Sequence, residues 1–96
     1  MVAKSTAVRI SFSDINFLKK MKKHKETYDL IINKLIDQCV QVIEQVEEDL
    51  FEPYEIFVIK MTDGTKERLD CIAKEKKMTR SEVLRKLVQA KAKGLC

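Results

Sequence analysis

Two short stretches of the sequence place a cation and then a hydroxyl group at alternating positions. In "VRIS" Arg9 precedes Ser11, and 51 residues later "IKMT" repeats the pattern with Lys60 and Thr62. Guanidinium, ammonium and hydroxyl groups can donate to guanine O6 and N7 or contact other base edges in the major groove of DNA. Because alternate residues of a strand share a face, the repeat predicts two short strands with a polar face suited to nucleic acid.

Apolar residues position these polar side chains. In the first strand the large apolar residues, Phe12 included, share one face, while Ala7, Arg9 and Ser11 share the other. The strand at residues 57–62 alternates in the same way. A strand followed by two helices cannot bury its apolar face or satisfy its edge alone, so each half of the chain needs a second strand.

Four helices are expected from apolar residues that recur at three- and four-residue steps. Ser13 or Asp14 is the expected N-cap of the first helix, and Thr27 of the second, whose period continues to about Asp49. The stretch "DGTKERLDCIAKEKK" predicts the third helix. "TRSE" is typical of a capping box and predicts the start of the fourth.

Charge is segregated along the chain. Residues 1–39 carry eight cations and four anions, residues 40–55 carry six anions and no cation, and residues 56–96 carry eleven cations and five anions. Two basic blocks that flank an acidic segment indicate an anionic partner that both blocks contact.

Several classes of function find no support in the sequence. One His, no glycine-rich phosphate loop and no cluster of metal ligands predict a protein that is not an enzyme, with no cofactor, metal or small-molecule substrate. Cys39, Cys71 and Cys96 are far apart and are expected to be reduced thiols. No apolar run approaches the ~20 residues of a membrane span, and a cytoplasmic protein without membrane contact is expected.

Both halves resemble ribbon-helix-helix transcriptional regulators, the superfamily of the methionine repressor, Arc and CopG. "FVIKMTDGTKERLDCIAKEKKMTRSEVLRKLV" is similar to the CopG-type consensus, and "VRISFSDINFLKKMKKHKETYDLIINKLI" is similar to archaeal members. The tandem form resembles regulators of archaeal viruses. The implied fold is mainly α with a short β ribbon, in two tandem β-α-α units at residues 5–39 and 56–93, joined by an acidic helical connector at 40–55.

The resemblance also implies site residues, because the ribbon of this family contacts bases and the start of the second helix of each unit binds phosphate. The expected base-contacting residues are Arg9, Ser11, Val58, Lys60 and Thr62, with Ala7 a weaker candidate. The expected phosphate-contacting residues are Thr27, Tyr28, Thr79, Arg80 and Ser81. The chain departs from the family in the apolar Ala7 and Val58, in turns without glycine, and in one extra residue in its second half.

The expected function is therefore that of a sequence-specific transcription regulator, such as a repressor, that inserts an antiparallel ribbon into the major groove of promoter or operator DNA. For a viral protein this would occur in the host cell cytoplasm. The alternative is an antitoxin that binds its own operator and a toxin protein, although the end at "KAKGLC" soon after the last helix favours the regulator. Two arrangements stay open: the strands pair within one chain, or between chains of a homodimer or higher assembly on DNA.

Overall fold

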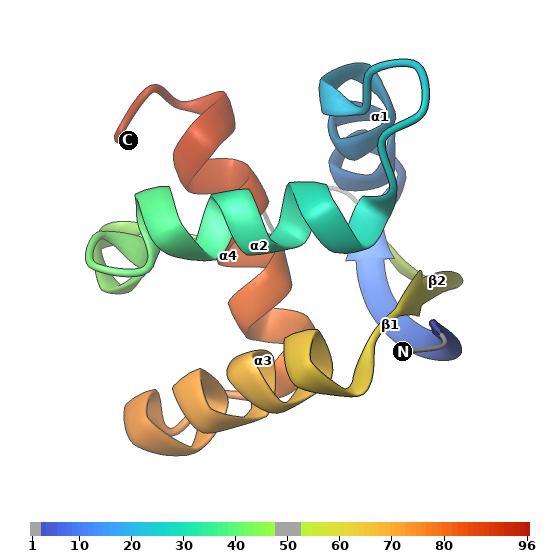
Figure 1. Cartoon of the computed structure of the whole chain (residues 1–96). Helices are drawn as coiled ribbons and strands as arrows, with labels where there is room; N and C mark the ends of the chain where they lie inside the picture. The colour runs from blue at the N-terminus through green and yellow to red at the C-terminus, as the bar shows by residue number, and fades with distance from the viewer. Residues whose placement is uncertain (1–2, 48–52) are drawn as a thin grey trace.

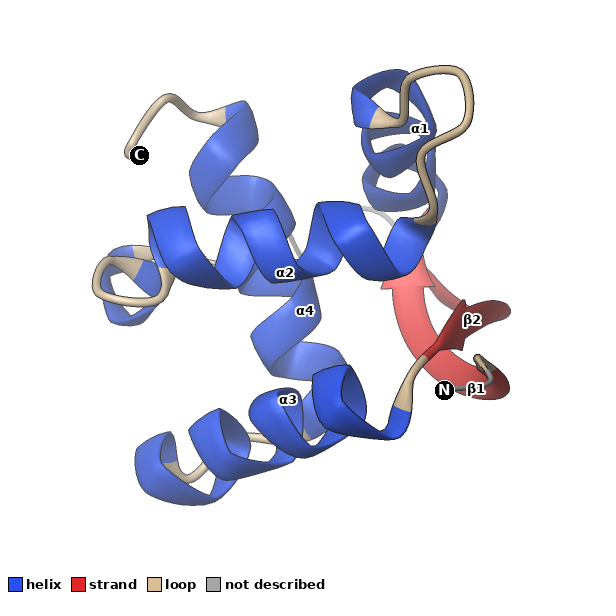
Figure 2. Cartoon of the chain, in the orientation of Figure 1, coloured by secondary structure: helices blue, strands red, loops and turns tan. Residues whose placement is uncertain are grey.

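The computed structural model describes residues 3–47 and 53–96 of the chain. Within these residues the protein is mainly helical, with four α-helices and a two-stranded antiparallel sheet (Figure 2). The elements in chain order are β1 (Lys4–Ser11), α1 (Phe12–Met21), α2 (Tyr28–Cys39), the 3-10 turn η1 (Ile43–Gln45), β2 (Tyr54–Met61), α3 (Asp63–Lys76) and α4 (Arg80–Ala92).

β1 and β2 pair with each other within one chain and form a ribbon. The ribbon lies at one side of the helices, and α2 passes across α4 (Figure 1). Lys4 pairs with Met61 at one end of the ribbon, and Ala7 pairs with Val58 at its centre. Ala7 and Val58 are 51 positions apart, which is the offset between the two repeats of the sequence. The register therefore gives the ribbon an approximate twofold axis through its central pair.

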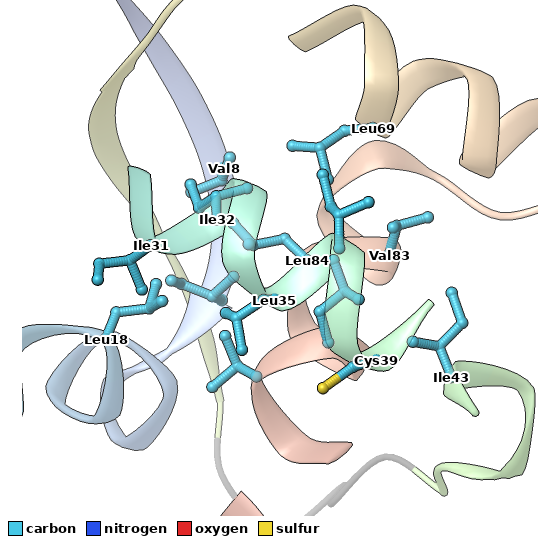
Figure 3. Packing of buried hydrophobic residues seen from close by; sticks show 14 of the residues in the cluster. Val8, Leu18, Ile31, Ile32, Leu35, Cys39, Ile43, Leu69, Val83 and Leu84 are labelled. Carbon is cyan, nitrogen blue, oxygen red and sulfur yellow. The ribbon is translucent and has the colours of Figure 1, made fainter. Parts of the chain in front are cut away.

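The inner face of the ribbon packs on the helices. Val8 and Ile10 of β1 and Ile59 of β2 are buried, and they belong to a core cluster with buried side chains from all four α-helices. Figure 3 shows Val8, Leu35 and Leu84 converging from β1, α2 and α4. Since both halves of the chain contribute to this core, neither buries its apolar surface without the other.

The first helix begins earlier than the sequence predicted. The Ser11 hydroxyl accepts from the Asp14 N–H at 3.1 Å, and the Asp14 carboxylate accepts from the Ser11 N–H at 3.4 Å. This capping box starts α1 at Phe12, so the expected cap at Ser13 or Asp14 was wrong. Phe12 consequently leaves the strand. Its side chain is 57% exposed and contacts the edge of Phe57 instead of entering the core.

The second helix is shorter than its periodicity predicted. α2 ends at Cys39, and the acidic segment that follows it forms the 3-10 turn η1. The predicted end of the helix, at Asp49, lies outside the described residues. Ile43 and Val46 are nevertheless buried. The apolar residues at three- and four-residue steps therefore remain buried after α2 has ended, because η1 packs against α4.

The turns that lack glycine use lysine instead. Lys25, between α1 and α2, has φ 71°, and Lys77, between α3 and α4, has φ 58°. These two lysines are 52 positions apart, as are the N-caps Thr27 and Thr79. The extra residue of the second half therefore lies before Lys77, where α3 has 14 residues and α1 has 10.

Cys39 and Cys96 form a disulfide, with their Cα atoms 5.3 Å apart, so the expectation of two reduced thiols was wrong. The chain turns back after α4 at Gly94, which has φ 74°. Lys91 Nζ donates to Gln38 Oε1 at 2.8 Å and so links the end of α4 to the end of α2. This return of the tail joins two cysteines that are 57 positions apart, while Cys71 stays a free, exposed thiol.

Cys96→Ser is expected to lower the free energy of unfolding by about 2–4 kcal/mol, because the disulfide restricts the unfolded chain. Thermal unfolding with and without reductant measures this effect. The wild-type Tm should fall to that of the variant on reduction, and the variant Tm should not change. Cys71→Ser is the matched control and should behave as the wild type. A wild-type Tm that is insensitive to reductant would contradict the disulfide.

Candidate nucleic-acid interface

The outer surface of the ribbon, which we term the ribbon face, carries six exposed side chains in three cross-strand pairs. Two cations stand at diagonally opposite corners, and the central pair is apolar. The pairs are Ser5 with Lys60, Ala7 with Val58, and Arg9 with Ile56.

The alternation of the sequence predicted part of this face. It placed Ala7, Arg9, Val58 and Lys60 outward, as they lie in the structure. Ile56 was missed because the second strand was expected to begin at residue 57, whereas β2 begins at Tyr54, and the Ile56 side chain is 70% exposed. Extending the period of two backward from Lys60 and Val58 is the signal that could have found it.

Ser11 and Thr62 do not lie on the ribbon face. Ser11 is only 5% exposed, because its hydroxyl caps α1. Thr62 is the half-buried N-cap of α3, and its hydroxyl accepts from the Thr65 N–H at 3.4 Å and donates to Asp29 Oδ1 at 3.2 Å. The expectation that both project outward was wrong, because the strand period ends where each helix begins.

The start of α4 covers the free edge of β1 at Arg9. The Arg9 N–H donates to Ser81 Oγ at 2.9 Å, and the Arg9 carbonyl accepts from the Arg85 guanidinium at 2.7 Å. The same guanidinium lies 4.1 Å from the centroid of the Tyr54 ring. These contacts fix the backbone of Arg9 while its side chain remains exposed on the ribbon face.

The start of α2 holds the end of β2 in a related way. Asp29 Oδ1 accepts from the Thr62 N–H at 2.7 Å. Thr27 caps α2 by accepting from the Leu30 N–H at 3.2 Å, and Thr79 caps α4 by accepting from the Glu82 N–H at 3.1 Å. Both helix N-termini that the sequence assigned to phosphate therefore lie next to the ribbon.

A surface hollow separates each of these N-termini from the ribbon. The α2 hollow has a volume of about 440 Å³, and the α4 hollow has a volume of about 490 Å³. The α2 hollow is lined by Lys22, Thr27, Tyr28, Val58, Lys60 and Thr62, among others. The α4 hollow is lined by Arg9, Tyr54, Thr79, Ser81, Glu82 and Arg85.

The α2 hollow adjoins a cationic loop, residues 22–25, which we term the lysine loop. Its lysines and His24 line a further hollow of about 350 Å³, and Lys22 Nζ lies 4.9 Å from the centroid of the Tyr28 ring. Glu26 holds the loop by accepting from the Lys23 N–H at 2.9 Å. The hydrogen bond from Lys34 to the Glu26 carboxylate, and that from the Lys23 N–H, lower the pKa of Glu26. One side of the ribbon is therefore flanked by a positive field.

The α4 side is less cationic. Arg80 donates through Nε and a terminal nitrogen to the two carboxylate oxygens of Asp70, at 2.6 and 3.0 Å. This pair lowers the pKa of Asp70 and directs the Arg80 side chain to α3. Glu82 and Lys86 form a further ion pair at 3.5 Å. The Arg80 side chain was expected to contact phosphate, but its guanidinium has an internal partner, Asp70, that the sequence did not indicate.

Two features are absent from the part of the chain that the structure describes. Within residues 3–47 and 53–96, no three His, Cys, Asp or Glu side chains are grouped so that they could hold a metal ion. No helix in these ranges has the length and apolar character needed to cross a membrane. The ribbon face itself consists of two cationic, one hydroxyl and three apolar side chains.

Ser11→Ala is expected to lower the free energy of unfolding by about 1 kcal/mol, because it removes the cap of α1. Urea denaturation measures the change, with Ser5→Ala as the control, since Ser5 is exposed and should change stability by less than about 0.5 kcal/mol. Equal stability of the Ser11 variant and the wild type would contradict the capping role.

The chain is similar over its whole length to a protein of Sulfolobus islandicus filamentous virus (isolate Iceland/Hveragerdi), which bears the name "Uncharacterized protein 29". The two sequences are 40% identical over 96 residues, which is 100% of each chain. No protein-family model matches the chain, and no solved structure matches it. An identity of this level over the full length shows common ancestry, so the chain belongs to the same family as this viral protein.

Proposed function

We propose that this protein is a sequence-specific DNA-binding regulator of transcription whose ribbon enters the major groove. The observation that carries the proposal is the ribbon face, which presents Arg9 and Lys60 at opposite corners of an exposed two-stranded sheet. A two-stranded ribbon fits the major groove of B-DNA, which is about 12 Å wide, and both cations can donate to guanine O6 and N7 there.

The register of the ribbon supports a ribbon-helix-helix protein with two tandem units in one chain. That family usually builds its ribbon from two equivalent strands of two chains. Here the central pair, Ala7 and Val58, joins positions that are equivalent in the two repeats. Each strand is also followed by two helices, so residues 5–39 and 56–93 supply most of one proposed unit each. β2 begins at Tyr54, inside the segment 40–55 that the sequence assigned to a connector, so the second proposed unit begins before residue 56.

The helix N-termini beside the ribbon support phosphate binding. The first N–H groups of a helix lack partners within it and carry partial positive charge, which favours anions. The starts of α2, at Thr27 and Tyr28, and of α4, at Thr79 and Ser81, lie on the two edges of the ribbon. We assign them to the phosphates on either side of the groove, and the lysine loop to further phosphates on the α2 side.

The intrachain ribbon gives one chain both base-contacting strands. A homodimer is therefore not needed to complete one binding surface, and any higher assembly on DNA would join complete ribbons. By occupying promoter or operator DNA in the cytoplasm of a host cell, the protein would act on transcription through exclusion or recruitment of other proteins.

Selection from random duplex DNA tests the proposal. The wild type should enrich a defined motif, and Arg9→Ala and Lys60→Ala should each lose about 1–3 kcal/mol on it and relax the choice of base at one position. The double variant should enrich no motif. Lys74→Ala removes an exposed cation near the far end of α3 and should keep the motif.

The selection separates two ways in which the proposal could fail. If the double variant enriches the same motif as the wild type, the ribbon face does not contact the bases. If the wild type enriches no motif and binds all duplexes with strong salt dependence, sequence-specific regulation is excluded.

The lysine loop is tested by the salt dependence of affinity. Lys22→Gln together with Lys23→Gln should reduce the slope of log K against log salt concentration by about 2, because two phosphate contacts are lost, while the preferred motif stays unchanged. Lys74→Gln together with Lys93→Gln removes the same charge from exposed positions at the far ends of α3 and α4. An equal change of slope in both double variants would show a general charge effect without contacts from the loop.

A further inference from the structure

Apolar side chains occupy half of the ribbon face. Val58 is 66% exposed at its centre and faces Ala7, while Ile56 is 70% exposed at one end and faces Arg9. Exposed β-branched residues on an uncovered sheet favour association with another surface. Base contacts from Arg9 and Lys60 alone would leave these apolar side chains without a ligand.

We infer that Val58 and Ile56 contact thymine methyl groups, so that the protein binds a site with thymine at its centre and at one end only. The inference rests on the proposed function and specifies its target. The C5-methyl group of thymine is the apolar feature that a base pair presents in the major groove, and apolar side chains contact it. A polyanion also matches the two corner cations and the lysine loop, whereas a second copy of the chain would bring the same cations into the interface.

The two ends of the ribbon face differ, although positions 51 residues apart in the sequence are equivalent in the two repeats. Arg9 and Lys60 are equivalent and are both cations, so the two ends of the face each present a cation. Ser5 and Ile56 are also equivalent, but one is polar and the other apolar.

One end of the face therefore pairs Lys60 with a hydroxyl, and the other pairs Arg9 with a branched apolar side chain. The geometry points to guanine at both ends, thymine at the centre, and thymine beside guanine at the Arg9 end. Such a site has a direction, and the protein would bind it in one orientation despite its nearly twofold ribbon.

Replacing single thymines of the selected duplex by deoxyuridine tests the inference, since only the methyl group is lost. We expect the Kd to rise about fourfold at the central position and about fourfold at the end position, the effect of losing one buried methyl contact. Val58→Ala should remove the sensitivity at the centre, and Ile56→Ala that at the end. Leu95→Ala shortens an exposed apolar side chain of the tail and should keep both sensitivities.

A gain of contact gives an independent test. Ser5→Ile places isoleucine at the second end of an exposed face, and selection with this variant should enrich thymine at both ends, so that the motif becomes nearly palindromic. A wild-type motif that is already palindromic, or specific binding that no uracil substitution weakens, would overturn the inference and leave the proposed function in place. The absence of any enriched motif would instead remove the proposed function itself.

Discussion

The antiparallel pairing of β1 with β2 is the constraint on which the rest of the structure depends. Each strand lies directly before a helix, so the register that sets Ala7 against Val58 also fixes the positions of the first turns of α1 and α3 relative to each other. The inner face of the ribbon then brings the helices of both halves to one core. A slip of one residue would exchange the buried and exposed faces of the strand that slips. In β1 this would expose Val8 and bury Arg9, and in β2 it would expose Ile59 and bury Lys60. Core packing therefore specifies the outer face as strictly as the inner one.

Polar contacts extend this constraint to the edges of the ribbon. The start of α4 holds Arg9 through Ser81 and Arg85, and the start of α2 holds Thr62 through Asp29. These bonds satisfy backbone groups that a two-stranded sheet leaves open, and they place the helix N-termini beside the exposed cations. The same bonds that complete the secondary structure thus bring together the groups assigned to bases and to phosphates.

The sequence predicted the two strands, the order of the helices and the outward position of Arg9 and Lys60, because a period of two and a period of 3.6 are local properties. The sequence-based prediction failed where a side chain bonds a partner that the periodicity does not show. Ser11 follows the strand alternation but caps a helix, and Arg80 begins a helix but pairs with Asp70 of another. It also could not show the disulfide, because Cys39 and Cys96 meet only through the packing of α4 on α2 and the turn that follows.

Because both strands belong to one chain, formation of the ribbon does not depend on the concentration of the protein. A ribbon formed by two separate chains dissociates on dilution, and its amount falls with the square of the monomer concentration. Here the linker between α2 and β2 keeps the second strand at a high effective concentration near the first, so folding of the ribbon is a unimolecular step. The amount of complete ribbon is then proportional to the amount of protein, even when a cell holds very few copies. A single chain also frees its two strands to differ, which no homodimer can do.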